Sequence, residues 1–107
     1  MASIPKEQWQ AFCDRLTKDL TGLSAEVEID SLDLGGQIEA RSLLVLGIAY
    51  DPKDDLFELA LEGVDHLINR PRELEVVEGG GGVTSLRVVD QDSVQHIVRF
   101  TEPLRLA

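Results

Sequence analysis

The stretch LLVLGIAYDPKDDLFELALEGVDHLINRPRELEVV, residues 43–77, decides how this chain folds. Its first two apolar runs flank a turn at 51–55, where Pro52 presets the backbone angle that the second residue of a turn requires. Residues 56–62 then alternate, and three large apolar side chains fall on one side: Phe57, Leu59 and Leu61. Alternation with a period of two is typical of a half-buried strand. The stretch therefore predicts two strands joined by the turn.

The same period of two recurs on either side of this hairpin. With residues 56–62 it predicts six strands in all, the others being 25–32, 37–50, 73–78, 83–89 and 94–101. Short connections favour antiparallel neighbours, because a parallel crossover needs a dozen or more residues. Gly47, inside the second of these segments, indicates a bulge or a bend. The four glycines at 79–82 are expected to form a flexible connection.

Residues 5–20 show a helical period instead. Their less polar side chains recur on one face of a helix: Trp9, Phe12, Cys13, Leu16 and Leu20. We expect Trp9 to anchor this helix on the sheet, with its indole N–H reaching a partner. The chain is thus expected to be a single α+β domain over residues 1–107. An N-terminal helix packs on a strongly bent, roughly six-stranded antiparallel sheet over about 25–101, with a partly open barrel as the alternative.

The charge balance excludes several classes of partner. Ten Lys and Arg side chains against twenty Asp and Glu give this 107-residue chain a formal net charge of −10. Nucleic acids and anionic membranes would repel it, because proteins that bind them gain affinity from positive charge. A basic protein remains a candidate partner. A second copy of the chain is another, because an uncovered sheet edge invites pairing into a homodimer.

Other features favour the cytoplasm as the location. The N-terminus lacks the basic region and the apolar run of a signal peptide. No apolar run approaches the roughly 18–20 residues that span a bilayer. The single cysteine, Cys13, falls on the apolar face of the predicted helix, which fits a reducing compartment and an inert thiol.

One polar cluster interrupts the apolar pattern between residues 64 and 72. It places an acid, a base and two cations close together in the sequence: Asp65, His66, Arg70 and Arg72. An enzyme or a small-anion-binding protein could use these residues, with His66 as a general base near neutral pH. Asp65 would be a poor partner for His66, because neighbours on a strand point to opposite faces. The alternative interpretation is a rigid bend in which His66 bonds a backbone carbonyl.

The remaining versatile side chains favour structural roles. The aspartates at 51–55 could offer oxygen ligands to Ca²⁺, but Lys53 occupies a ligand position of the EF-hand pattern, so a turn is the simpler interpretation. His96 shares its parity with Val98 and Phe100 in a predicted strand, and two histidines at unrelated spacing support a zinc site only weakly. No nucleophile elbow, phosphate loop or paired-histidine zinc motif occurs. We therefore expect no catalytic residue, no metal and no cofactor.

Several motifs together resemble one known family. They are YDPKDD at 50–55, ALEGVDHLI at 60–68, PREL at 71–74, Ile4-Pro5 with Trp9 and Phe12, TSL at 84–86, VVD at 88–90, QHIV at 95–98 and Pro103-Leu104. In these motifs the chain resembles a bacterial family called domain of unknown function 5335, over nearly its whole length. The resemblance implies a single-domain bacterial protein. It transfers no site, because the family carries no established activity, cofactor or catalytic residue.

Together these features predict a small, acidic, non-catalytic binding or accessory module of the cytoplasm. Two alternatives stay open. An enzyme or small-anion-binding protein would use the neighbourhood of His66, Arg70 and Arg72, and an open pocket containing His66 and an arginine would favour it. An acidic decoy would occupy a basic, nucleic-acid-binding protein, and carboxylates spaced like phosphates on one face would favour that.

Overall fold

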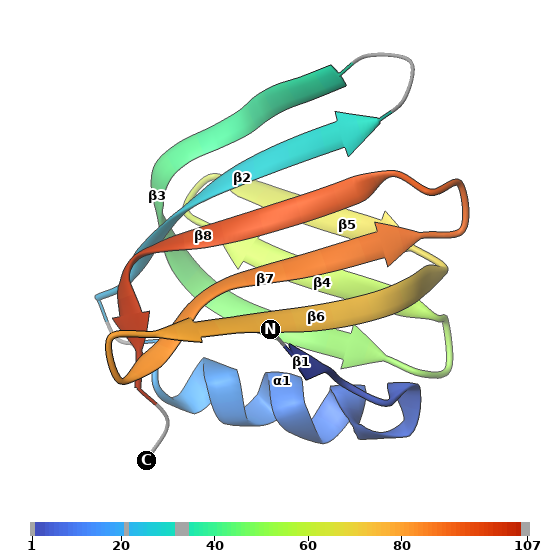
Figure 1. Cartoon of the computed structure of the whole chain (residues 1–107), viewed down its shortest axis with the longest axis horizontal. Helices are drawn as coiled ribbons and strands as arrows, with labels where there is room; N and C mark the ends of the chain where they lie inside the picture. Colours follow the sequence, from blue (N-terminus) through green and yellow to red (C-terminus); the bar gives the residue numbers. More distant parts are fainter. Residues whose placement is uncertain (1, 21, 32–34, 106–107) are drawn as a thin grey trace.

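The computed structural model describes residues 2–20, 22–31 and 35–105 of the chain. The described residues form a short 3-10 helix, one α-helix and eight strands (Figure 1): η1 (Lys6–Gln8), α1 (Trp9–Lys18), β1 (Ala2–Ser3), β2 (Ser24–Ser31), β3 (Gly35–Asp51), β4 (Leu56–Leu61), β5 (Val64–Asn69), β6 (Pro71–Gly79), β7 (Gly82–Asp90) and β8 (Gln95–Leu104). The strands make one antiparallel sheet in the order β1-β6-β7-β8-β2-β3-β4-β5. The predicted α+β class is therefore confirmed.

The long strand β3 changes its partner half-way along its length. It pairs with β2 as far as Leu44, and with β4 from the pair of Val45 and Leu61 onward. The register shifts between Val45 and Gly47, which confirms the irregularity predicted at Gly47, since a bulge bends the strand that carries it. Beyond this point the sheet folds over, so that β4 and β5 lie behind β7 and β8 in Figure 1.

Helix α1 lies along the second half of β3, on the edge that β2 leaves uncovered. Thr17 Oγ1 accepts a hydrogen bond from the N–H of Ile48 at 2.9 Å and donates one to the C=O of Ile48 at 2.7 Å. One side chain thus replaces a neighbouring strand at this position. Trp9 is 1% exposed and meets Tyr50 edge to face, with 5.1 Å between ring centroids. Its indole N–H donates to the C=O of Ile4 at 2.7 Å, as predicted for an anchoring tryptophan.

The inward side chains of both halves of the sheet meet in one core with the apolar face of α1. Phe57 and Leu59 of β4 are fully buried, which confirms the alternation predicted from the sequence. The four glycines at 79–82 connect β6 to β7. They make a tight hairpin turn in which Gly80 and Gly81 have φ angles of +60° and +87°, the conformation that a two-residue hairpin loop requires.

Two predictions about the fold need correction, the number of strands and the length of the α-helix. Among the described residues the sheet has eight strands rather than six, and it is open, with β1 and β5 as its two ends. Strand β1 is too short to show a period, whereas β5 lies in the polar segment 64–72, and within β5 only His66 and Ile68 are buried. The α-helix is shorter than 5–20, since η1 precedes it and it ends at Lys18. The end of the strand predicted at 25–32 lies outside the described residues.

Among the described residues, no helix has the length and apolar character needed to cross a membrane.

Leu59→Ala should lower the free energy of unfolding by about 2–5 kcal/mol, because removing a buried side chain leaves a cavity. The control, Leu46→Ala, removes the same atoms from a side chain of β3 that is 59% exposed. It should change the free energy of unfolding by less than about 0.5 kcal/mol. Urea unfolding followed by circular dichroism measures both. Equal effects of the two substitutions would contradict the inward position of Leu59.

Candidate functional site

Two histidines and an aspartate form a hydrogen-bonded chain between the two halves of the sheet. His66 of β5 and His96 of β8 both point inward, with exposed fractions of 6% and 7%. His66 Nε2 lies 2.9 Å from His96 Nδ1. His96 Nε2 lies 3.1 Å from Oδ2 of Asp90, the last residue of β7. The three side chains therefore tie the end strand β5 to the β7–β8 hairpin.

The hydrogen bonds of Asp90 determine the role of the His96 nitrogen that faces it. Its Oδ1 accepts from the backbone N–H groups of Asp92 and Val94 at 2.9 and 3.1 Å. Burial raises the pKa of Asp90, but the hydrogen bonds from His96 and the two N–H groups lower it by more, so the pKa lies below its ordinary value. An ionised carboxylate can only accept. His96 Nε2 therefore donates to Asp90, and the facing nitrogens of His96 and His66 share one proton between them as donor and acceptor.

The geometry is that of hydrogen bonds rather than of a metal centre. The two imidazole centroids are 5.1 Å apart and the facing nitrogens 2.9 Å apart, so these nitrogens lie between the rings and point at each other. Ligands of a single metal ion would direct both lone pairs to one common point. In the part of the chain that the structure describes, no group of three or more His, Cys, Asp or Glu side chains is placed to hold a metal ion.

A depression of about 480 Å³ lies beside this chain, between the end of β5 and the β7–β8 turn. Its lining includes His96, three carboxylates (Asp54, Asp90 and Asp92) and one cation, Arg70. The guanidinium of Arg70 donates from Nη1 to Oε1 of Gln91 at 3.3 Å. Because carboxylates outnumber cations here, the depression suits a basic group better than an anion.

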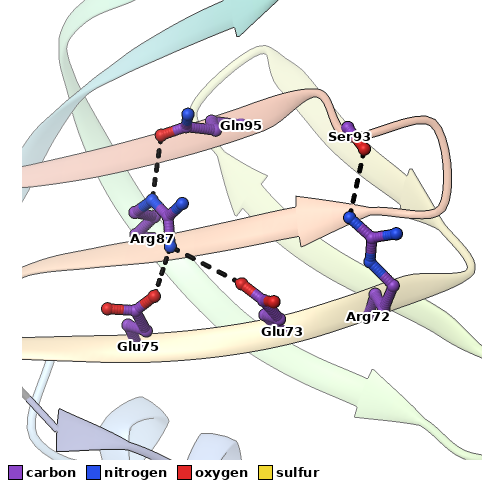
Figure 2. Close-up of polar contacts among 6 residues, drawn as sticks. All are labelled: Arg72, Glu73, Glu75, Arg87, Ser93 and Gln95. Carbon is purple, nitrogen blue, oxygen red and sulfur yellow. Dashed lines mark hydrogen bonds and ion pairs between the residues drawn. The ribbon is translucent and has the colours of Figure 1, made fainter.

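The structure does not bring the four predicted site residues together. Asp65 lies opposite Ala60 and is exposed, whereas its neighbour His66 points into the protein. Arg72 donates from Nη2 to Oγ of Ser93 at 3.1 Å (Figure 2), and Arg70 lines the depression without His66. His66 Nε2 contacts the ring of His96, a partner that the bend interpretation did not assign to it.

The sequence did not identify Asp90 as a member of this hydrogen-bonded chain, and it did not predict the contact between His96 and His66. The parity of His96 with Val98 and Phe100 correctly placed it on an inward face, because all three are buried. Its contact with His66 depends on the fold-over of the sheet, which brings β5 to β8. No local pattern in the sequence carries that information.

The other candidates have structural roles. Asp51 Oδ1 accepts the N–H of Lys53 at 2.9 Å, which confirms the predicted turn. Asp55 Oδ1 accepts from the Tyr50 hydroxyl at 2.6 Å and lies 3.0 Å from Lys6 Nζ. These two hydrogen bonds lower the pKa of Asp55. Burial raises the pKa of the Cys13 thiol to about 12, so its thiolate is disfavoured, as predicted.

On the outer face of β6, β7 and β8, arginines pair with neighbouring carboxylates. Arg87 of β7 forms ion pairs with Glu73 and Glu75 of β6, and its Nε donates to Oε1 of Gln95 at 2.9 Å (Figure 2). Arg99 of β8 likewise pairs with two glutamates of β2. Positive charge on this face is therefore used locally.

Residues 45–70, which we call the acidic half, differ from this outer face in having exposed carboxylates without ion pairs to described residues. They comprise the second half of β3, β4, β5 and their turns, and they carry six carboxylates against two basic side chains. The salt bridges among the described residues leave out Glu58, Glu62 and Asp65. Glu58, Glu62 and Asp65 are all exposed. The acidic half therefore carries more negative charge per residue than the rest of the chain.

Asp90→Asn should lower the free energy of unfolding at pH 7 by about 1–3 kcal/mol, because it weakens the bonds to His96 and to two backbone N–H groups. The pKa of Asp90 is lower in the folded than in the unfolded state. Its contribution is therefore present above the unfolded value of about 3.9 and lost as the pH falls through the folded-state value.

Urea unfolding between pH 2 and pH 7 measures this dependence, and the variant should lose less stability than the wild type on acidification. Asp92→Asn is the matched control, because the Asp92 side chain is exposed on the same turn. A control that behaved like Asp90→Asn would contradict the assignment.

Comparisons with known proteins confirm the resemblance seen in the sequence. A model of the family described as "Family of unknown function (DUF5335)" matches residues 1–107. A protein of Aquifex aeolicus (strain VF5), described as an uncharacterized protein, is 39% identical over 105 residues. The match covers 97% of this chain and 95% of that protein. No solved structure matches the chain.

Proposed function

We propose that this chain, which belongs to the family of unknown function DUF5335, is a non-catalytic accessory module. Its geometry indicates that it binds basic segments of other proteins. The observation that carries this proposal is the acidic half, where Glu58, Glu62 and Asp65 stand exposed without ion pairs to described residues. Unpaired charge of one sign attracts a partner of the opposite sign and steers its approach.

The hydrogen bonding of the polar cluster argues against catalysis as the main role. A general base needs a nitrogen that can reach the proton of a substrate. Both ring nitrogens of His96 already lie at hydrogen-bond distance from Asp90 and His66. The alternative of an enzyme or small-anion site at His66, Asp65, Arg70 and Arg72 receives little support, because Asp65 and His66 face opposite sides of β5 and the depression is mainly acidic.

The same charge argument selects among the candidate partners. A second copy of this chain would bring two acidic halves together, and nucleic acid or an anionic membrane would be repelled. A basic protein is favoured, and a nucleic-acid-binding protein held in an inactive state belongs to that class. We place this function in the bacterial cytoplasm, where a free, buried cysteine such as Cys13 is stable.

Affinity capture from a lysate of the native host tests the proposal when it is run with charge variants. The test variant combines Glu58→Gln, Glu62→Gln and Asp65→Asn in the acidic half. The control variant makes the same change in charge elsewhere, at exposed residues, with Glu7→Gln, Glu78→Gln and Glu102→Gln. We expect a basic protein that the wild type and the control retain, and that the test variant or moderate salt releases.

Two results would contradict this function. One is a captured partner that the test variant retains as well as the wild type does at every ionic strength. The other is turnover of a substrate by the purified chain that His96→Gln abolishes while the folded state persists.

A further inference from the structure

We infer that strand β5 receives an extended, basic segment of a partner protein as an added strand along its free edge. This inference rests on the proposed function and specifies the surface and the mode of binding. It follows from the direction of the backbone groups of β5, from the side chains beside them, and from the acidic depression at the end of the strand.

The hydrogen bonds of Ile48 establish in which direction the backbone N–H and C=O groups of β3, β4 and β5 point. Both the N–H and the C=O of Ile48 bond Thr17 of α1, so they point away from β4. In an antiparallel pair, residues alternate between those that exchange hydrogen bonds and those that do not. Leu59, which lies opposite Ile48, therefore directs its own N–H and C=O toward β5 and its partner His66.

A second hydrogen bond gives the same alternation independently. The N–H of Arg70 donates to the C=O of Asp55 at 2.9 Å, so residue 70 bonds toward the β4 side, as residues 66 and 68 do. The residues between them must point the other way. Asp65, Leu67 and Asn69 thus direct their N–H and C=O groups to the free edge, since β5 is the last strand of the sheet.

The side chains along this edge are those of an interaction surface. Leu67 and Val64 are 52% and 43% exposed, and they are two of the four large apolar side chains that are exposed among the described residues. Leu67 lies opposite Glu58 and Asp65 lies opposite Ala60 on the outer face. On this face an added strand would meet the apolar side chain of Leu67, which favours an apolar residue of the partner opposite it, and the carboxylates of Asp65 and Glu58 lie beside that position.

The depression extends this surface on the inner side of the edge. It is bounded by residues 67–70 of the chain and by Asp90 and Asp92 of the opposite hairpin. Successive side chains of an added strand point to opposite faces. Those that do not lie over Leu67 would therefore enter the depression, where carboxylates favour a lysine or an arginine.

The opposite end of the sheet offers no comparable edge. Strand β1 has two residues, and short edge strands discourage further pairing. A second copy of the chain is a poor occupant of β5, because exposed Asp65, Glu58 and Glu62 would approach those of the other copy. The observations therefore favour a basic segment of a different protein.

Three capped heptapeptides test the inference with the full chain in low-salt buffer. The probe is Lys-Val-Lys-Val-Lys-Val-Lys. The first control replaces the central valine by proline, which keeps the charge but disrupts strand pairing. The second control is Glu-Val-Glu-Val-Glu-Val-Glu. We expect the probe to bind much more tightly than either control, and to slow amide hydrogen exchange at Asp65, Leu67 and Asn69 more than at His66 and Ile68.

Two leucine variants locate the site. Leu67→Lys should weaken binding of the probe several-fold, because it places a positive charge at the centre of the edge. Leu46→Lys adds the same charge to β3 at a residue that is also exposed, and it should have little effect. Since both side chains lie at the surface, the two variants should fold.

The possible outcomes distinguish a failure of strand addition from a failure of the proposed function. Equal binding of the probe and the proline control, or protection away from β5, would overturn strand addition while leaving the binding of basic segments intact. Failure of both basic peptides to bind at low salt would overturn the proposed function as well. A concentration-dependent dimer by light scattering that Leu67→Lys dissociates would overturn the inference, because β5 would then pair with a second copy.

Discussion

The change of partner within β3 is the constraint on which the rest of this structure depends. A strand of 17 residues is too long to pair with one neighbour here, and the bulge at 45–47 turns its second half away from β2. The edge so exposed is covered by α1, with Thr17 bonding both backbone groups of Ile48. Without that contact, β3 would present unpaired backbone groups beside the core, which is costly when they are buried.

The fold-over also explains why the polar cluster ties strands together. It places His66 against His96, and Asp90 holds His96 through a charge-assisted hydrogen bond. These bonds fix β5 by its inward face. The outward face and the free edge of β5 remain available, together with the carboxylates of the acidic half. One arrangement thus accounts for an internal role of the histidines and an external role of the strand that carries His66.

Local patterns in the sequence predicted what depends on neighbouring residues. The alternation around Leu59 gave a strand with the correct face inward, and Gly47 marked the bulge. The strand β5 within segment 64–72 was not predicted, because most residues of this segment are polar and one of the two buried side chains of β5 is a histidine. The candidate site failed to converge for a physical reason: Asp65 and His66 are adjacent in sequence, but strand geometry sends them to opposite faces. The contact of His66 with His96 joins residues 30 positions apart, and only the tertiary fold determines it.

Nitrogen-15 NMR of the imidazole rings measures this contact most directly. In a sample labelled at histidine, the hydrogen bond between His66 and His96 should give a scalar coupling between His66 Nε2 and His96 Nδ1. Asp90→Asn should weaken the bond at the other nitrogen of His96 and shift its resonance. Two rings without mutual coupling, each exchanging its N–H rapidly with water, would show that β5 does not fold over onto β8 and would contradict the account.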